Sequence, residues 1–139
     1  MKILLIVALA FATLPSARAG SPDRLFGLVS IQCHSRADGI LFQHVASKRY
    51  NGPNNEEQMS LDVTIPFGNG ELHAPFLVDQ VTRDGNLTVS AQDRGMNELE
   101  ITVLERAAPT EPDYLPARVK YNGEDLKIPG LACFAISAG

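Results

Sequence analysis

The chain has 139 residues, of which 45% are hydrophobic and 20% are charged, and its 12 Lys and Arg against 16 Asp and Glu give a formal net charge of −4. This composition is too hydrophobic for a disordered chain, and the negative charge argues against nucleic acid as a partner. The length suits one domain with a single hydrophobic core.

The first residues have the three-part layout of a secretory signal peptide. A basic start is followed by an apolar run over residues 3–14 and by a segment that ends in Ala-x-Ala at Ala19. The run is too short to span a bilayer, so we predict a signal peptide over 1–19 that is cleaved near Ala19. Its removal takes away one Lys and one Arg, which leaves 10 − 16 = −6 for residues 20–139. The sequence thus predicts one acidic domain that is secreted or periplasmic, with no stable membrane anchor.

The rest of the chain consists of short alternating segments separated by turn signals. In the segment 58–67, Leu61, Val63 and Ile65 share a face opposite Asp62, which is the period-two pattern of a strand with one wet side. Asp-Gly and Asn-Gly pairs between such segments favour hairpin turns, because both central positions of a type I′ turn need a positive φ. In chain order, we predict strands at 25–33, 39–47, 58–67, 71–82, 86–92, 97–106, 115–121 and 125–136, the last with a bend at Pro129-Gly130.

This pattern predicts an all-β fold of about eight antiparallel strands in a meander. Such a meander can close into a small barrel or fold into a two-sheet sandwich, and the sequence leaves both open. Residues 20–139 are expected to form this single domain.

The two cysteines, Cys33 and Cys133, are expected to form one disulfide. An exported chain meets an oxidising environment, and no Cys-x-x-Cys spacing suggests a redox pair. The bridge would close a loop of 133 − 33 = 100 residues and join the first predicted strand to the last. The two ends of the domain should therefore be neighbours.

Parts of two predicted strands are apolar on both sides. These parts are residues 25–31 of the first predicted strand and residues 128–136 of the last. In the second, Phe134 lies in the set that would face outward if Cys133 faces the core. A soluble monomer rarely leaves such a patch bare. The strands could lie in the middle of a sandwich sheet or under a loop, or they could form an interface with a second copy or a partner protein.

Catalytic and metal motifs are missing from the sequence. His34, His44 and His73 have neither the i, i+2 spacing of two ligands on a strand nor the i, i+4 spacing of a helix. His44 shares a strand face with Ile40 and Phe42 if that segment is extended, so it is predicted to be partly buried and hydrogen-bonded. Gly-x-Ser-x-Gly and His-Glu-x-x-His are absent. We therefore expect no catalytic residues, no metal and no cofactor.

A proline-rich loop is the best candidate for partner recognition. The segment 106–116 contains three prolines and presents Tyr114 beside Glu111 and Asp113. Such a segment is stiff and loses little entropy on binding, and an aromatic side chain next to acids can anchor a basic partner. Alternatively, the prolines protect a sheet edge and Tyr114 folds back on the body of the domain.

These observations lead to one main hypothesis and two alternatives. The main hypothesis is an exported, non-enzymatic binding module, inhibitor-like or adaptor-like, that engages a protein partner or a second copy through its loops and outer strand faces. Glu111, Asp113, Tyr114 and Phe134 are its predicted contact residues. The alternatives are a carrier of a small apolar ligand inside a barrel and an enzyme of unknown class.

Overall fold

The computed structural model describes residues 25–138, which form nine strands and no α-helix. The predicted signal peptide at 1–19 lies outside the described residues. The strands are β1 Leu28–Ala37, β2 Ile40–Asn51, β3 Glu57–Phe67, β4 Gly70–Arg83, β5 Leu87–Gln92, β6 Glu98–Val103, β7 Leu115–Tyr121, β8 Glu124–Leu126 and β9 Ala132–Ser137. No helix within residues 25–138 is long and apolar enough to cross a membrane.

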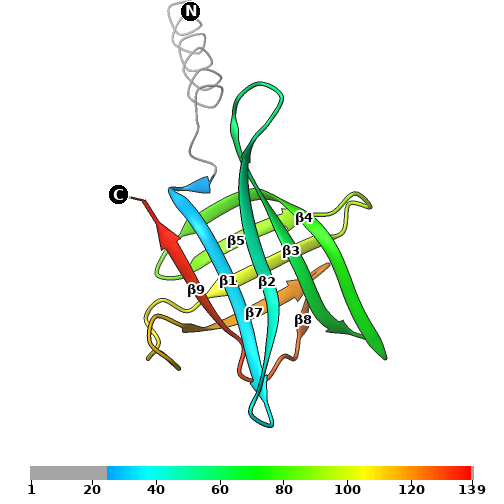
Figure 1. Cartoon of the computed structure of the whole chain (residues 1–139), viewed down its shortest axis with the longest axis vertical. Coiled ribbons are helices and arrows are strands. Elements are labelled where there is room, and N and C mark those ends of the chain that lie inside the picture. The colour runs from blue at the N-terminus through cyan, green and yellow to red at the C-terminus, as the bar shows by residue number, and fades with distance from the viewer. Residues whose placement is uncertain (1–24, 139) are drawn as a thin grey trace, which may run out of the picture.

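Eight of these strands close into an antiparallel barrel, which resolves the choice between barrel and sandwich. Strands β1 to β7 pair in chain order, and β9 completes the circle because it pairs with both β7 and β1. The first and last strands of the domain consequently run side by side (Figure 1). The all-β meander and the neighbouring ends of the domain, both predicted from the sequence, are confirmed.

The prediction of a single last strand over 125–136 is wrong. This segment is divided into β8, which pairs only with the end of β7, and β9, which lies in the barrel wall. Between them, Gly130 has a φ of 70°, a left-handed conformation that glycine adopts without strain. The Pro129-Gly130 signal therefore breaks the strand where the sequence suggested only a bend.

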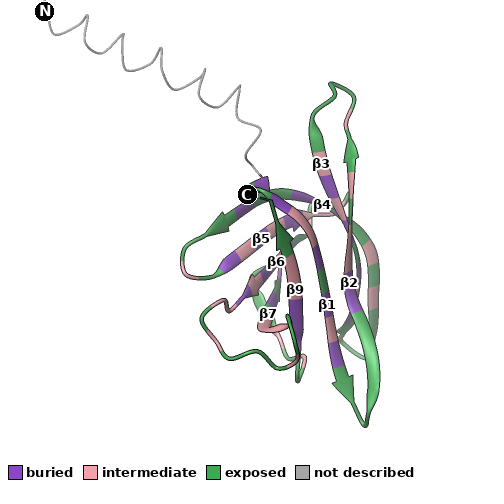
Figure 2. Ribbon diagram, turned by 60° about the vertical axis from the view of Figure 1, so that its left-hand side comes forward, coloured by how far each residue is buried: buried purple, intermediate pink, exposed green. Residues whose placement is uncertain are grey.

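The barrel interior is filled by the alternating apolar side chains that the sequence predicts. Along β3, for example, Leu61, Val63 and Ile65 are fully buried, whereas Asp62 between them is exposed. Figure 2 shows the resulting alternation of buried and exposed residues along the strands. The largest fully buried side chains are those of Leu28, Ile31, Met59, Leu61, Ile65, Phe76, Leu87, Leu99 and Ile101. The core is therefore the barrel axis itself.

The wall of the barrel is complete between β1 and β9 but divides between β2 and β3. Pairing of β2 with β3 runs from Asn51 opposite Glu57 as far as Val45 opposite Val63, and it stops there. Beyond this point, the β1–β2 hairpin and the β3–β4 hairpin separate (Figure 1). A β-bulge in the β1–β2 register and Pro66, which has no N–H to offer a neighbouring strand, both lie at this end.

Candidate functional site

The two separating hairpins leave a cleft of about 320 Å³ between them. Its lining combines apolar side chains from three parts of the chain, Phe42, Pro66 and the Ile128-Pro129 pair, with the polar residues Ser35, Gln43, His44 and Thr64. A mostly apolar cleft with a few convergent polar groups has the composition typical of a binding site.

Three residues form a chain of hydrogen bonds in the wall of this cleft. The Oγ atom of Ser35 lies 2.6 Å from Nε2 of His44, and Nδ1 of the same ring lies 2.7 Å from the backbone carbonyl oxygen of Thr64. A carbonyl oxygen can only accept, so Nδ1 carries the proton and donates. In the neutral ring, Nε2 then has a free lone pair, and the Ser35 hydroxyl donates to it. The tautomer is thus assigned from the hydrogen-bond partners.

The local sequence explains how Ser35 and His44 meet. They lie on either side of a two-residue turn, Asp38-Gly39, whose φ values of 51° and 78° suit a tight hairpin. Cys33 lies opposite Val45 and His34 lies opposite Gln43, so His44 is the extra residue of the bulge. The bulge turns its ring into the gap between β2 and β3, where it bonds a carbonyl that β2 no longer pairs.

The sequence predicted a partly buried, hydrogen-bonded His44, and the residue is hydrogen-bonded and only 8% exposed. The predicted face was wrong, however, because Ile40 and Phe42 are exposed while His44 is buried. Strict alternation cannot anticipate a bulge. Ser35, 6% exposed, was not recognised as a site residue at all. The sequence feature that could have identified this pair is the position of a serine and a histidine on opposite strands of one short hairpin.

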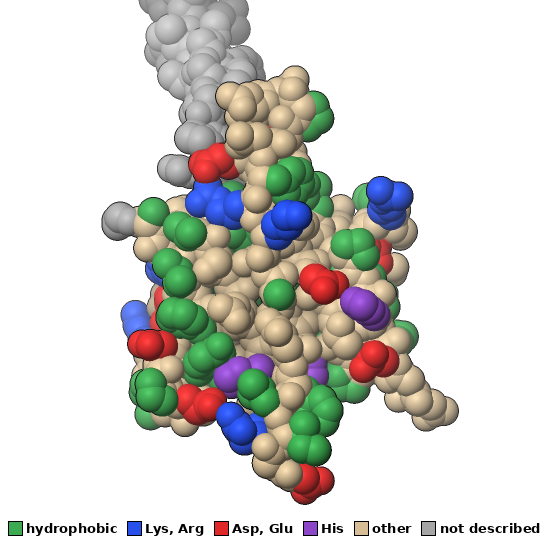
Figure 3. All heavy atoms as spheres, in the orientation of Figure 1, with side chains coloured by type: hydrophobic (Ala, Val, Ile, Leu, Met, Phe, Trp, Pro, Cys, Tyr) green, Lys and Arg blue, Asp and Glu red, His purple; other side chains and the backbone are tan. Residues whose placement is uncertain are grey.

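The tip of the β1–β2 hairpin exposes three consecutive large apolar side chains. Ile40 is 57% exposed, Leu41 51% and Phe42 45%, and we call these three residues the apolar tip. Figure 3 shows hydrophobic side chains gathered at this tip. Single exposed apolar residues are normal on a protein surface, but a contiguous group beside a cleft is typical of an interaction site.

The proline-rich loop packs against the outer face of β1 and β9. Its Glu111 carboxylate lies 3.2 Å from Nε2 of His34 and 3.3 Å from Nη2 of Arg36. The Tyr114 ring stacks on His34 at a centroid distance of 4.1 Å and contacts Phe134 at 5.7 Å. Three of the predicted contact residues, Glu111, Tyr114 and Phe134, are thereby brought together.

The fourth predicted contact residue, Asp113, is exposed and has a φ of 70° in the turn between Glu111 and Tyr114. The loop accounts for part of the outward apolar set of β9, since Ala132 is buried and Phe134 is partly buried. Ile136, further along the strand, stays exposed. The sequence left open whether this apolar face is covered by a second sheet strand, a loop, a second copy or a partner protein. The structure shows a loop over the first half of β9.

Directly beneath this loop, Cys33 and Cys133 form a disulfide between residues that lie opposite each other on β1 and β9. Both cysteines are buried. The disulfide is compatible with an oxidising, extracellular compartment.

The three histidines lie in separate environments. His34 faces Glu111, His44 faces Ser35, and the exposed His73 lies 3.1 Å from a carboxylate oxygen of Asp62. Within residues 25–138, no three His, Cys, Asp or Glu side chains converge as a metal site would require.

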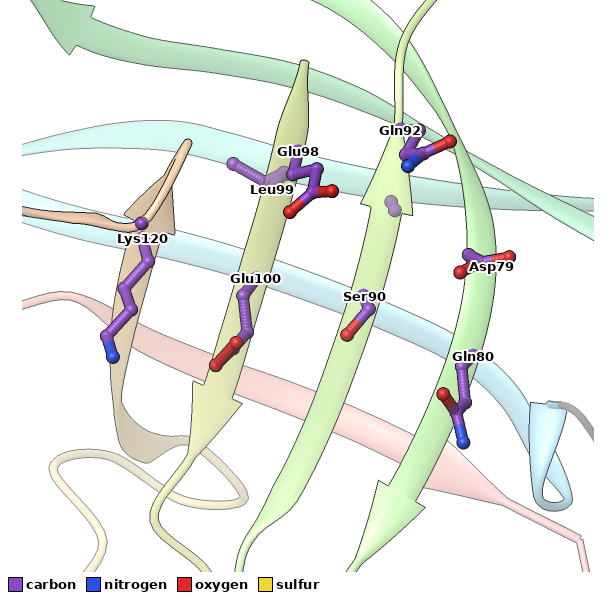
Figure 4. Close-up of a pocket in the computed structure, with 10 residues that line it drawn as sticks. Asp79, Gln80, Ser90, Gln92, Glu98, Leu99, Glu100 and Lys120 are labelled. Atoms are coloured by element: carbon purple, nitrogen blue, oxygen red, sulfur yellow. The ribbon is translucent and has the colours of Figure 1, made fainter. Parts of the chain in front are cut away.

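Two of the further grooves in the described part of the chain lie on the outer wall. One, of about 260 Å³, presents Asp79 on β4 and Glu98 and Glu100 on β6 beside Lys120 on β7, as Figure 4 shows. Such a mixed polar row is typical of a solvated sheet face. The other, of about 470 Å³, includes the exposed side chain of Leu77.

No family model, curated protein or solved structure matches the chain.

Proposed function

We propose that the chain is an exported, non-enzymatic binding module that engages a protein partner through the apolar tip and the cleft behind it. Export is supported by the signal-like segment at 1–19 and by a disulfide of the kind that persists in oxidising compartments.

The observation that carries the proposal is the exposure of Ile40, Leu41 and Phe42 on one hairpin tip. Complete burial of an aliphatic or aromatic side chain of this size is worth about 1.5–3 kcal/mol, so a partner that covers the tip gains strongly from it. Phe42 belongs both to the tip and to the cleft lining, so one partner surface can cover the tip and place an apolar side chain in the cleft. Central anchors of this kind dominate the energetics of most protein interfaces.

Charge supports a basic partner surface. The predicted mature chain has a net charge of 10 − 16 = −6, and of the two charged residues that line the cleft, Glu71 and Arg36, the arginine is already paired with Glu111. A charge of this sign steers a basic protein toward the barrel and raises its association rate.

No observation favours the carrier alternative. The side chains of Ile31, Leu61, Phe76 and Ile101 are among those that fill the barrel axis, which is where a carrier of this size would hold its ligand.

The proposal is tested by capture of the partner from the exported fraction with wild-type protein and single variants. Leu41→Ser and Phe42→Ser should each weaken capture by about 30-fold or more, the effect of an interface anchor worth about 2 kcal/mol. Leu77→Ser is the matched control, because Leu77 is exposed to a similar extent in the outer-wall groove of about 470 Å³. This variant should capture the partner as well as the wild type does.

Equal capture by wild type and by both tip variants would contradict the proposal. Loss of capture only with Tyr114→Ala and Phe134→Ser would also contradict it, since that result would transfer binding to the proline-rich loop.

A further inference from the structure

We infer that Ser35 is a nucleophile activated by His44, and that it accepts one acyl or phosphonyl group per chain, without turnover, from a small, apolar ester-like compound that enters the cleft. This inference goes beyond the proposed function and does not depend on it, because it concerns the chemistry of one hydroxyl group in the cleft wall.

The hydrogen-bond geometry is that of a serine and its general base. The Thr64 carbonyl holds the proton on Nδ1 of His44 at 2.7 Å, and the lone pair of Nε2 faces Oγ of Ser35 at 2.6 Å. A nucleophile within hydrogen-bond reach of a base, with the base oriented by a third group, is the recurring arrangement for covalent catalysis. The carbonyl takes the orienting position that a carboxylate holds in many serine hydrolases.

The other histidines of the described chain show that this arrangement is specific to His44. Nε2 of His34 faces the Glu111 carboxylate, and Nε2 of His73 faces the Asp62 carboxylate. A carboxylate can only accept, so Nε2 of His73 donates to Asp62, and Nε2 of His34 likewise lies against an acceptor and not against a hydroxyl group. Only the His44 ring presents its second nitrogen to a hydroxyl group within residues 25–138.

A nearby serine provides a second contrast. Oγ of Ser47 accepts a hydrogen bond from the backbone N–H of Ile31 at 2.8 Å, which is a structural role inside the β1–β2 pair. Ser35 instead lines the cleft together with His44. Ser35 is therefore a residue of the cleft wall, which Ser47 is not.

The lining and the volume of the cleft indicate which class of compound could bind there. Phe42, Pro66 and Ile128 make much of the lining apolar, and about 320 Å³ admits a small acyl or alkyl group. The charged groups on the lining are Arg36 and Glu71, and Arg36 is already engaged by Glu111. A neutral ester with an apolar acyl part fits this environment better than a charged one.

The reaction conserves atoms and charge. Oγ of Ser35 bonds to the acyl carbon while its proton passes to Nε2 of His44. The bond from the acyl carbon to the ester oxygen then breaks, and the His44 imidazolium protonates the departing alkoxide. With a fluorophosphonate, the Oγ–P bond forms, the P–F bond breaks, fluoride leaves and the proton passes from His44 to water.

The test is covalent labelling of the folded full-length mature protein with an alkyl fluorophosphonate, followed by intact and peptide mass spectrometry. We expect one adduct per chain, on the peptide that contains Ser35, and a one-equivalent burst of p-nitrophenol from p-nitrophenyl butyrate. Ser35→Ala should abolish both signals. His44→Gln should slow labelling about 10²- to 10⁴-fold, the usual contribution of a general base. Ser90→Ala, a serine on the outer-wall groove, should label as wild type does.

Circular dichroism establishes that each variant is folded, and partner capture is measured on the same samples. A native wild-type chain that acquires no adduct at Ser35 would overturn the inference without any reference to variants. Equal labelling of native and urea-unfolded protein would also overturn it, because an activated serine needs the folded hairpin. Loss of labelling with unchanged capture separates this site from the proposed binding function.

Discussion

The β1–β9 seam and the β2–β3 seam, the two lines along which these strands meet, are closed in different ways. At the β1–β9 seam, backbone pairing is reinforced by the Cys33–Cys133 disulfide inside the barrel and by the loop that carries Glu111 and Tyr114 outside it. At the β2–β3 seam, pairing stops at Val45. Across the gap that follows, Nδ1 of His44 bonds the carbonyl of Thr64.

The two seams therefore differ in the free energy that is needed to open them. A seam held by pairing, a covalent bond and a packed loop should open only when the whole domain unfolds. Beyond Val45 the β2–β3 seam lacks this pairing and is bridged by the His44 side chain, so this end should open locally at a lower free energy, and ligand sites are drawn from such regions. We therefore expect one side of the barrel to stay closed in the folded protein and the other side to open locally.

Removal of the disulfide should have the largest effect on the first seam. The Cys33→Ala/Cys133→Ala double variant loses a crosslink across 100 residues, which the chain-entropy model values at about 4.7 kcal/mol. We expect a fall of this order in the free energy of unfolding, measured by urea denaturation. Reduced wild-type protein is the control and should fall by a similar amount. A loss below about 1 kcal/mol would show that pairing and the loop hold the seam without the bridge.

Truncation of His44 should have an intermediate effect on the second seam. His44→Ala leaves the Thr64 carbonyl and the Ser35 hydroxyl without their partner, and an unsatisfied buried polar group costs about 1–3 kcal/mol. Amide exchange should accelerate in the β1–β2 and β3–β4 hairpins and stay unchanged along β1–β9. His73→Ala removes an exposed histidine and should alter stability by no more than about 0.5 kcal/mol. Uniform acceleration over all strands would mean that the two seams are not independent.

The sequence predicted the strands and the disulfide far better than the open end of the β2–β3 seam. The alternation of Leu61, Val63 and Ile65 and the count of two cysteines are local or countable patterns, and they led to the correct all-β meander and disulfide, while barrel and sandwich both stayed open. The bulge at His44 depends on how two hairpins twist apart, which is a property of the closed barrel. Alternation therefore assigned His44 to the same face as Phe42, and the Ser35–His44 contact went unrecognised.

The loop shows the same limit in a milder form. Its prolines indicate a stiff segment. The sequence is compatible both with Tyr114 as an anchor for a partner and with Tyr114 packed back onto the domain. The contacts of Tyr114 with His34 and Phe134 depend on residues 80 and 20 positions away (114 − 34 and 134 − 114), which no local pattern connects.

Removal of the Tyr114 ring should weaken the outer cover of the first seam by a smaller amount. Tyr114→Ala loses two aromatic contacts, each of a kind worth about 0.5–1.5 kcal/mol, so we expect a loss of about 1–2 kcal/mol in unfolding free energy. Limited trypsin digestion should cut faster at Arg106, within the released loop. Tyr50→Ala, which removes an exposed ring on β2, is the control and should change neither measurement. An unchanged cleavage rate would show that the prolines alone hold the loop in place.

The smallest effect is expected in the β5–β6 turn, which belongs to neither seam. The Asp93 carboxylate accepts hydrogen bonds from the side-chain amide of Asn97 at 2.9 Å and from the backbone N–H groups of Asn97 and Gly95. These bonds, the Asn97 side chain first, lower the pKa of Asp93 below its ordinary value of 3.8.

Because the pKa of Asp93 is lower in the folded state than in the unfolded state, its stabilisation is present above the ordinary value of 3.8. It is lost as the pH falls through the lower, folded value. Asp93→Asn should therefore be slightly less stable than wild type at pH 7, and the difference should shrink below about pH 4. Urea denaturation of both proteins between pH 7 and pH 2.5 measures it. A difference that stays constant across this range would mean that the carboxylate charge does not hold the turn, and that its shape alone sets the β5–β6 register.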